Sequence, residues 1–453
     1  MQKKIPLFSL VMLIVAAIDS IRNLPAMALF GHSLIFFFLL SAVLFLIPVA
    51  LVSAEFSARY PDKGGVFQWV RQAFGEKTGF LAIWLQWINT MVWYPTILSF
   101  IAGTLAYLFD PALAQNKVFL ASVILVVFWG LTLINLRGIR VSAKINDFCA
   151  SLGTILPMGL IIACGVYWLV SGKGSQISLR AGEFVPSWSL SQNWVALVAI
   201  MASFLGMELS GVHVNDIANP RRNFPKAIGI SIVVLIATML LSALSIAVVL
   251  PEKEIRLVDG VMQFFSSIGM PKGFIPVLTL MILVGSLGNM INWLLSPAKG
   301  LLQAAECGFL PKFFAKKNKY DVPVPILFVQ AILVSLFCLA FILMPSVNAF
   351  YWFLTDLSTE LYMLMYLLLF AAALRVGRPK KDAGHFALPR GLRGLVCCLG
   401  VIGALLTIVV GYFPPSEIDV GSGLEYCLLI AGGNVVLVAP ALLLCRYRSG
   451  GLK

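Results

Sequence analysis

Charged side chains are scarce in this chain of 453 residues. They make up 12% of the sequence, whereas roughly 25% is usual in a soluble domain. Hydrophobic residues make up 60%, and the mean hydropathy is +0.94. This composition excludes a soluble globular chain, and we expect one polytopic membrane domain over residues 1–453 in contact with the lipid bilayer.

Histidine is scarce too, and the motifs of several enzyme classes are absent. The three histidines, His32, His213 and His385, lie far apart near the ends of hydrophobic runs. The sequence contains no GxxxxGK[ST] nucleotide loop, no HExxH and no nucleophile elbow. Its eight cysteines lack CxxC spacing, which is typical of buried cysteines rather than of metal ligands or disulfides. We therefore expect neither an enzyme nor a cofactor or metal.

Hydrophobic runs long enough to cross a bilayer, which takes roughly 20 residues, recur along the chain. Twelve are predicted, near 5–30, 33–56, 79–108, 118–136, 148–171, 193–214, 226–250, 274–297, 324–344, 349–373, 394–413 and 422–445. The fold class predicted is an all-α integral membrane protein with twelve transmembrane helices.

The net charge of +13 comes from loops on one side of these spans. With the N-terminus inside, 26 of the 33 lysines and arginines fall in cytoplasmic segments, which predicts cytoplasmic termini and no nucleic-acid partner. Lys3 and Lys4 precede a hydrophobic run, as in a signal peptide, but Asp19 and Arg22 would interrupt its apolar core, so we expect the segment to be retained. Short loops favour the bacterial inner membrane.

Polar residues interrupt the first span between Asp19 and Pro25. Such residues are costly in lipid unless they face a cavity inside the protein, and a helix broken at membrane depth has the same requirement. Solute transporters build their binding sites at such breaks. Asp19, Ser20 and Arg22 are therefore candidate site residues, although Asp19 and Arg22, three apart, could instead neutralise each other.

The sixth span repeats the pattern between Ser203 and Gly211, where glycines and serines surround the acid Glu208. Glycine weakens a helix and lets a ligand approach the backbone. Glu208 would cap freed N–H groups or compensate Arg22. Because five spans separate the two breaks, we predict that spans 1–5 (about 5–171) and 6–10 (about 193–373) are inverted repeats. Spans 11 and 12 (about 394–445) would be peripheral.

The tenth span carries hydroxyl groups on one helical stripe and two acids on another face. The stripe is formed by Thr355, Thr359, Tyr362 and Tyr366, and the acids are Asp356 and Glu360. The stripe predicts either a cavity wall or interhelical hydrogen bonds. The acids would sit in an external vestibule or pair with other helices.

Two further spans hold polar candidates. Asn289 in the eighth span would bind either a solute or a neighbouring helix. Glu55, at the inner end of the second span, lies four residues before Arg59, a spacing that favours an ion pair on the helix surface.

Several stretches together resemble the amino acid–polyamine–organocation transporter superfamily over nearly the whole chain. They are Ala54-Glu55-Phe56, Gly64-Gly65-Val66-Phe67-Gln68-Trp69, Phe204-Leu205-Gly206-Met207-Glu208, Asn219-Pro220-Arg221-Arg222, Ser296-Pro297-Ala298-Lys299-Gly300 and Val322-Pro323-Val324-Pro325. Within the superfamily the chain is most similar to glutamate/GABA antiporters, on the evidence of Gly31-His32-Ser33-Leu34, His213-Val214-Asn215-Asp216, Gly260-Val261-Met262-Gln263 and Tyr362/Tyr366.

This resemblance implies a five-plus-five inverted repeat with broken helices 1 and 6, alternating access, and exchange of amino acids. The substrate-binding residues it implies are Asp19, Ser20, Arg22, Leu205, Gly206, Met207, Asn289, Tyr362 and Tyr366. The buried acid Glu208 joins them as a candidate partner, with Asp19, for the amine of a solute. The sequence departs from the antiporter pattern at Arg22, where an aromatic residue is usual, and at Asn289, where an acid is usual.

Three functions remain open on the sequence. The first is an antiporter of glutamate-, glutamine- or GABA-like amino acids, with Arg22 meeting a carboxylate. The second is a proton-coupled symporter, in which Asp19, Glu208 or Glu360 carries the proton. The third is a nutrient sensor, for which no output domain is present. The oligomeric state is left open.

Overall fold

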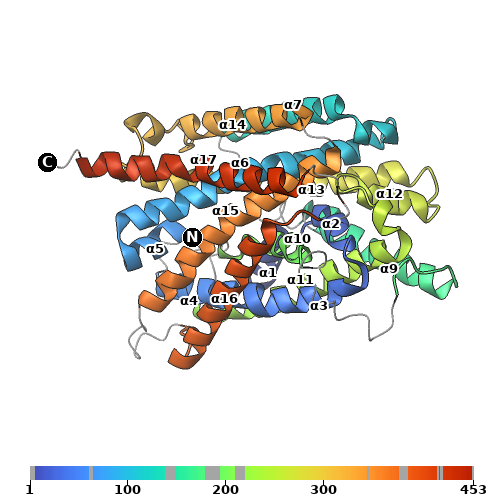
Figure 1. Ribbon diagram of the computed structural model, residues 1–453, viewed down its shortest axis with the longest axis horizontal. Helices are drawn as coiled ribbons and strands as arrows, with labels where there is room; N and C mark the ends of the chain where they lie inside the picture. Colours follow the sequence, from blue (N-terminus) through green and yellow to red (C-terminus); the bar gives the residue numbers. More distant parts are fainter. Residues whose placement is uncertain are drawn as a thin grey trace.

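The computed structural model describes residues 6–60, 65–137, 148–149, 151–178, 194–209, 220–343, 346–376, 386–415, 418 and 422–450. Within these ranges every regular element is a helix, and the helices pack into one bundle (Figure 1). The main helices are α1 (Leu7–Ile18), α2 (Leu24–Ala28), α3 (Leu34–Ser41), α4 (Ile47–Arg59), α5 (Val66–Phe74), α6 (Glu76–Ala106), α7 (Lys117–Asn135), α9 (Leu156–Val170), α10 (Ala196–Ser203), α11 (Pro220–Val249), α12 (Gly260–Ser267), α13 (Ile275–Glu306), α14 (Val324–Leu343), α15 (Val347–Arg375), α16 (Arg390–Gly411) and α17 (Gly423–Gly450).

Eight helices in the described part of the chain are long and apolar enough to cross a membrane. They coincide with the predicted spans 2, 4, 5, 7, 8, 10, 11 and 12. The four other predicted spans fall on α1 with α2, on α6, on α10 and on α14. The all-helical membrane fold is thus confirmed, and the full count of twelve spans stays a prediction.

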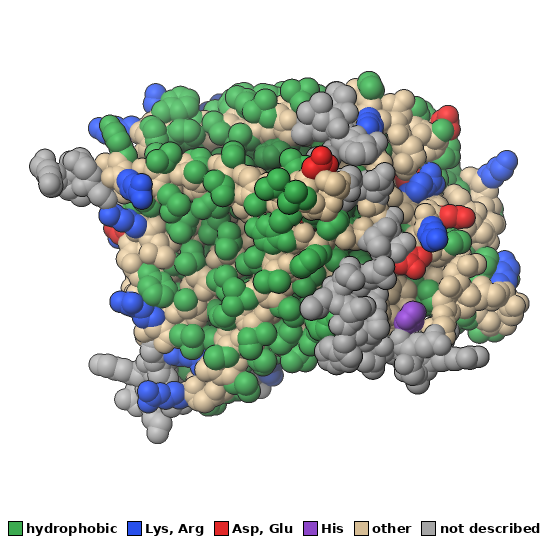
Figure 2. All heavy atoms as spheres, in the orientation of Figure 1, with side chains coloured by type: hydrophobic (Ala, Val, Ile, Leu, Met, Phe, Trp, Pro, Cys, Tyr) green, Lys and Arg blue, Asp and Glu red, His purple; other side chains and the backbone are tan. Residues whose placement is uncertain are grey.

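The surface has the form expected of a protein that lies in lipid. Figure 2 shows a broad hydrophobic face across the middle of the molecule, with charged side chains gathered at its two ends. Large apolar side chains such as Val126, Val233 and Leu443 are well exposed on this surface. In water such exposure would be unfavourable, whereas hydrocarbon tails solvate these side chains.

The long helix α15 lies at the centre of the bundle and packs against α6 on one side and α16 on another (Figure 1). It starts at a normal helix cap, where the Ser346 hydroxyl accepts a hydrogen bond from the Ala349 N–H at 3.0 Å. Most of its side chains are buried, among them Trp352 and Tyr366, so that both faces of the helix contact protein. This central position lets α15 contribute to more than one site.

The ion pair expected between Glu55 and Arg59 does not form. The carboxylate of Glu55 accepts hydrogen bonds from the guanidinium of Arg393 on α16, and Arg59 donates to the backbone carbonyl of Val376 at 3.2 Å. The prediction was wrong because it considered only neighbours on one helix, whereas α16 packs against α4. Glu55 keeps the structural role that was expected of it, with another partner.

One helix crossing is close enough to require glycine on both sides. The turn Ser151–Ile155, which precedes α9, crosses α13 where Gly153 meets Gly285. A Cβ on Gly153 would lie 2.2 Å from the Gly285 Cα, well inside van der Waals contact. Glycine at both positions lets the two backbones make van der Waals contacts that larger side chains would prevent.

We therefore expect Gly153→Ala to destabilise the protein by roughly 1–3 kcal/mol, because overpacking forces the two backbones apart. The measurement is thermal unfolding of the purified protein in detergent. Gly159→Ala is the matched control, since a Cβ at Gly159 on the following helix meets nothing within 4 Å. Equal melting temperatures for the two variants would contradict the close crossing.

Candidate functional site

The first predicted break lies where the sequence placed it. Helix α1 ends at Ile18, and Asp19 and Ser20 are extended, with ψ angles of 109° and 111°. A short 3₁₀ turn, Ile21–Asn23, then leads into α2, in which Pro25 occupies the first turn. Proline suits that position because it has no N–H to leave unpaired there.

The second break follows α10, which ends at Ser203. Gly206 has a φ angle of +104°, which side chains rarely adopt, and a Cβ there would lie 3.0 Å from the Trp293 ring. Glycine is therefore required at this turn, because a side chain would strain the backbone and crowd the Trp293 ring. The rest of the predicted break, Ser210 and Gly211, lies outside the described residues, as does the segment His213–Asp216.

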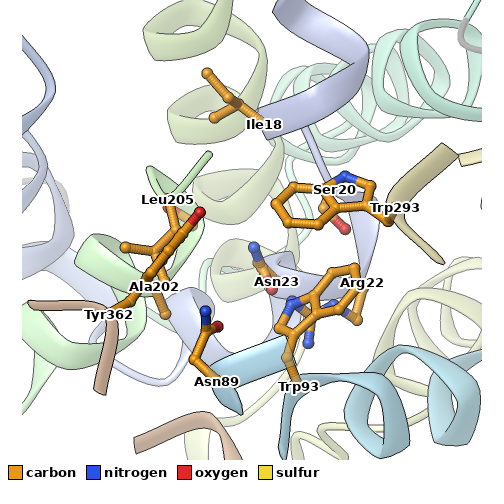
Figure 3. Close-up of a pocket in the computed structure, with 11 residues that line it drawn as sticks. Ile18, Ser20, Arg22, Asn23, Asn89, Trp93, Ala202, Leu205, Trp293 and Tyr362 are labelled. Carbon is orange, nitrogen blue, oxygen red and sulfur yellow. The ribbon is translucent and has the colours of Figure 1, made fainter. Parts of the chain in front are cut away.

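A pocket lies between the two breaks. The empty space between its lining residues is about 410 Å³, counted with the part that opens toward solvent. Figure 3 shows its side chains, which come from both breaks and from α6, α13 and α15. The lining residues are Ile18, Ser20, Arg22, Asn23, Asn89, Trp93, Ala202, Ser203, Leu205, Trp293 and Tyr362.

Arg22 is the charged residue of this lining, and it is 3% exposed. One of its terminal nitrogens, Nη1, donates to Thr96 Oγ1 at 2.5 Å and to the Tyr351 hydroxyl at 3.4 Å. The guanidinium carbon lies 5.1 Å from the centre of the Trp93 ring, within cation–π range. Its Nε has no hydrogen-bond partner. None of the ion pairs in the described part of the chain includes Arg22.

Asp19 does not neutralise Arg22, although the two are only three residues apart. Its Oδ2 accepts a hydrogen bond from Thr238 Oγ1 on α11 at 2.8 Å, and its Oδ1 has no partner. The extended backbone at Asp19 and Ser20 turns the two side chains to different neighbours. Asp19 is buried and is not part of the pocket lining.

Glu208 lies beside the pocket and joins the second break to two long helices. Its Oε1 accepts hydrogen bonds from Gln86 Nε2 on α6, at 2.8 Å, and from the Tyr362 hydroxyl on α15. Its Oε2 accepts from the Tyr366 hydroxyl, which itself accepts from the Gly206 N–H at 3.1 Å. These three donors are side-chain groups, so Glu208 supports the break through Tyr366, which takes the freed Gly206 N–H, and the ion pairs of the described residues do not join Glu208 to Arg22.

The other predicted residues divide between the pocket and its surroundings. Ser20, Leu205 and Tyr362 line the pocket with Arg22. Met207 and Tyr366 are fully buried outside the lining. The position of Asn289 falls within α13, but its side chain is outside what the structure describes. Of the predicted stripe on the tenth span only Tyr362 reaches the pocket.

Sequence reasoning missed the residues that α6 contributes. Asn89 and Trp93 line the pocket, while Gln86 and Thr96 bind Glu208 and Arg22. A signal was available, because an amide pair interrupts an otherwise apolar span at Gln86 and Asn89. Polar residues at membrane depth mark functional positions even without a charge.

Helix α12 lies outside the long apolar spans and packs against α2, which follows the first break. A Cβ on Gly260 would lie 2.8 Å from the side chain of Pro25, so α12 lies directly against α2. The residue before α12, Asp259, is buried and accepts from the Tyr107 hydroxyl at 2.8 Å while Arg256 pairs with it at 3.0 Å. Burial raises the pKa of Asp259, and the charge of Arg256 opposes this shift.

We expect Tyr366→Phe to loosen the second break. The variant keeps the ring packed against Phe45, but the Gly206 N–H loses its acceptor and Glu208 loses a donor. An unsatisfied buried polar group costs about 1–3 kcal/mol, so both melting temperature and solute binding should fall. Tyr167→Phe on the exposed surface of α9 is the control, and it should change neither. Unchanged stability and binding in Tyr366→Phe would contradict this role for the hydroxyl.

Comparison with known proteins relates this arrangement to membrane transporters. Residues 5–434 match the model of the amino acid permease family. An uncharacterized transporter of Legionella pneumophila is 39% identical, over 96% of this chain and 95% of its own. A glutamate/gamma-aminobutyrate antiporter of Lactococcus lactis is 30% identical, over 96% of this chain and 89% of its own. A probable agmatine/putrescine antiporter of Lactococcus lactis is 24% identical, over 98% and 95%.

The family match covers both breaks and the pocket between them, and the relatives align over nearly their full lengths. The chain belongs to the amino acid permease family of the amino acid–polyamine–organocation superfamily.

Proposed function

We propose that this permease is an antiporter that exchanges an acidic amino acid for a related neutral or decarboxylated one, with glutamate-, glutamine- and GABA-like solutes as substrates. The observation that carries the proposal is the buried, unpaired charge of Arg22 in the pocket lining. Removing a cation from water without a counter-ion is costly. A bound carboxylate would supply that counter-ion.

The geometry of the guanidinium favours a carboxylate over other anions. Thr96 and Tyr351 occupy one terminal nitrogen of Arg22, and the Nε is left without a partner. Arginine binds carboxylates through two parallel N–H donors, and this planar pairing is both stronger and more selective than a single contact. The aromatic rings of Trp93 and Tyr351 hold the guanidinium in place for such a contact.

The same charge argues against cationic solutes. One relative is named as a probable agmatine/putrescine antiporter, and both of those solutes carry positive charge. A cation in this pocket would lie near Arg22 in a medium of low dielectric, where like charges repel strongly. The relatives named as glutamate/gamma-aminobutyrate antiporters, which are 30% and 33% identical, therefore offer the better guide to substrate.

Uncharged polar side chains of the pocket lining would contact the other parts of the solute. Ser20, Asn23 and Asn89 all line the pocket. The backbone at the two breaks has N–H and C=O groups that no regular helix satisfies, and these suit the carboxylate and amine of an amino acid. Trp93 and Trp293, with ring centres 5.0 Å apart, form an apolar wall beside them.

The transport cycle follows from the predicted architecture. We propose that spans 1–5 and 6–10 are inverted repeats that rock around the pocket, with both termini in the cytoplasm of a bacterial cell. Proton-coupled symport on the same fold is the alternative function. It is favoured by one observation, that the buried acid Asp19 has an oxygen without a partner.

Counterflow in proteoliposomes tests the exchange. We expect labelled glutamate to enter vesicles preloaded with glutamate, glutamine or GABA, and to enter empty vesicles far more slowly. Putrescine inside the vesicles should not support uptake. Equal uptake into empty vesicles under a pH gradient would instead establish the symporter.

Substitution of Arg22 tests the binding role directly. Loss of a hydrogen bond to a charged group costs about 1.5–3 kcal/mol, so Arg22→Gln should weaken glutamate binding by roughly ten- to hundredfold. Glutamate has two carboxylates, whereas GABA has one carboxylate and an amine, and glutamine has an amide in place of the second carboxylate. The affinity for glutamate relative to GABA and glutamine should therefore change as well. Arg22→Lys should be intermediate, because it keeps the charge and loses the planar fork.

The control is Arg390→Gln, which removes an exposed arginine at the start of α16. It should leave glutamate binding and exchange unchanged. Binding of all three solutes at wild-type affinity by a folded Arg22→Gln variant would exclude the proposed role.

A further inference from the structure

A second pair of acids lies on α15, away from the pocket lining. Asp356 and Glu360 are one helical turn apart, and each is 1% exposed. They face the region where α15 meets α16 and α17, a contact visible in Figure 1. The amino acid exchange proposed above assigns them no role.

Each of these carboxyl groups has one oxygen with a donor. Asp356 Oδ2 accepts from the Tyr426 hydroxyl at 2.5 Å, and Glu360 Oε2 accepts from the Asn434 amide, so both donors belong to α17. The other oxygen of each acid, Asp356 Oδ1 and Glu360 Oε1, is buried without any hydrogen-bond partner. The pair therefore has two buried carboxyl oxygens that accept no hydrogen bond.

The two unpartnered oxygens face the same small volume. A Cβ on Gly411 of α16 would lie 2.6 Å from Asp356 Oδ1 and 2.8 Å from Glu360 Oε1. Because Gly411 has no side chain, both oxygens have room beside the position that its Cβ would occupy. A hydrogen carried by either oxygen could be shared with the other there.

No basic group compensates this pair in the described part of the chain. The ion pairs found there include neither acid. The titratable groups beside the pair are Tyr426 on α17 and Tyr412 just after α16, with Cys427 next to Tyr412. The other helices that pack on α15, which are α4, α5, α6 and α10, contribute no described charged group that acts on it.

We propose that Asp356 and Glu360 form a proton-binding site in which one carboxylic acid donates its hydrogen to the neighbouring carboxylate. Two adjacent buried carboxylates repel each other and lose solvation, and one proton removes half of the charge and satisfies both free oxygens. The proton comes from water and returns to it, with no change in any covalent bond of the chain other than the O–H bond.

A proton fits this site better than a metal cation. Hard divalent cations take roughly six oxygen ligands, as in the sites of calcium and magnesium. Around this pair the unpartnered side-chain oxygens that the structure describes are Asp356 Oδ1, Glu360 Oε1 and the Asn434 amide oxygen. Tyr426 and Asn434 direct hydrogens at the remaining carboxyl oxygens, an arrangement suited to an anion that shares a proton.

The site is mechanically connected to the pocket. Ser358, between the two acids on α15, donates to Asn89 Oδ1 at 3.2 Å, and Asn89 lines the pocket. Tyr362, two residues after Glu360, lines the pocket and donates to Glu208. Loss of the shared proton would drive the carboxylates apart and shift α15 relative to α16 and α17. Transport is thereby made dependent on pH.

The first experiment needs no solute, so its result does not depend on whether the exchange proposal is correct. Infrared spectra of the purified full-length protein distinguish a protonated carboxyl group from a carboxylate. We expect a protonated-carboxyl signal at pH 7 that is smaller by the contribution of one carboxylic acid in the Asp356→Asn/Glu360→Gln double variant, which leaves the buried acids Asp19, Glu208 and Asp259 in place. The control Glu425→Gln, which alters an exposed acid on α17, should keep the signal. A double variant with the wild-type spectrum overturns the proposal.

The second experiment measures counterflow in proteoliposomes between pH 5 and pH 8. A step governed by one proton changes by up to about tenfold per pH unit, and we expect this dependence in the wild type and in Glu425→Gln. Glu360→Gln, which mimics a permanently protonated pair, should exchange solutes with a flat pH profile. A wild-type profile in that variant overturns the proposal. So does loss of the infrared signal when Na⁺ is added at constant pH, since a metal cation would then occupy the site.

Discussion

The hydrogen bonds around the Glu208 carboxylate hold the centre of this protein together. A helix that ends inside a membrane leaves backbone groups that lipid cannot satisfy. At the second break Tyr366 takes the Gly206 N–H and, with Tyr362 and Gln86, surrounds Glu208 with donors. One buried carboxylate therefore connects the break to α6 and α15. These bonds tie the broken segment to the two long helices that also line the pocket.

The separation of Asp19 from Arg22 has a comparable consequence at the first break. On a regular helix a spacing of three residues would let the two side chains pair and cancel their charges. The extended backbone instead directs Asp19 to Thr238, while Arg22 lines the pocket and contacts Thr96 and Trp93. The local conformation thus keeps a positive charge in the pocket lining, where it is available to the carboxylate of the proposed solute.

The acids of α15 show how one central helix serves two regions. Tyr362 and Tyr366 turn toward Glu208, while Asp356 and Glu360 turn toward Tyr426, Asn434 and Gly411. The sequence indicated these two faces from helical periodicity. It left open whether the acids reach a vestibule or another helix, and the structure places them against α16 and α17. The location of the two acids depends on how α16 and α17 pack, and the sequence pattern of α15 does not specify that packing.

The sequence by itself determined the membrane fold, the long apolar helices and the positions of both breaks, because these depend on local properties: hydrophobic length, proline, glycine and buried polar residues. Only the tertiary structure decided the partners. Thr96 and Tyr351 lie 74 and 329 residues from Arg22, and Arg393 lies 338 residues from Glu55. Contacts at such separations follow from how helices pack, which hydrophobic patterns leave undetermined since lipid-facing and protein-facing surfaces are equally apolar.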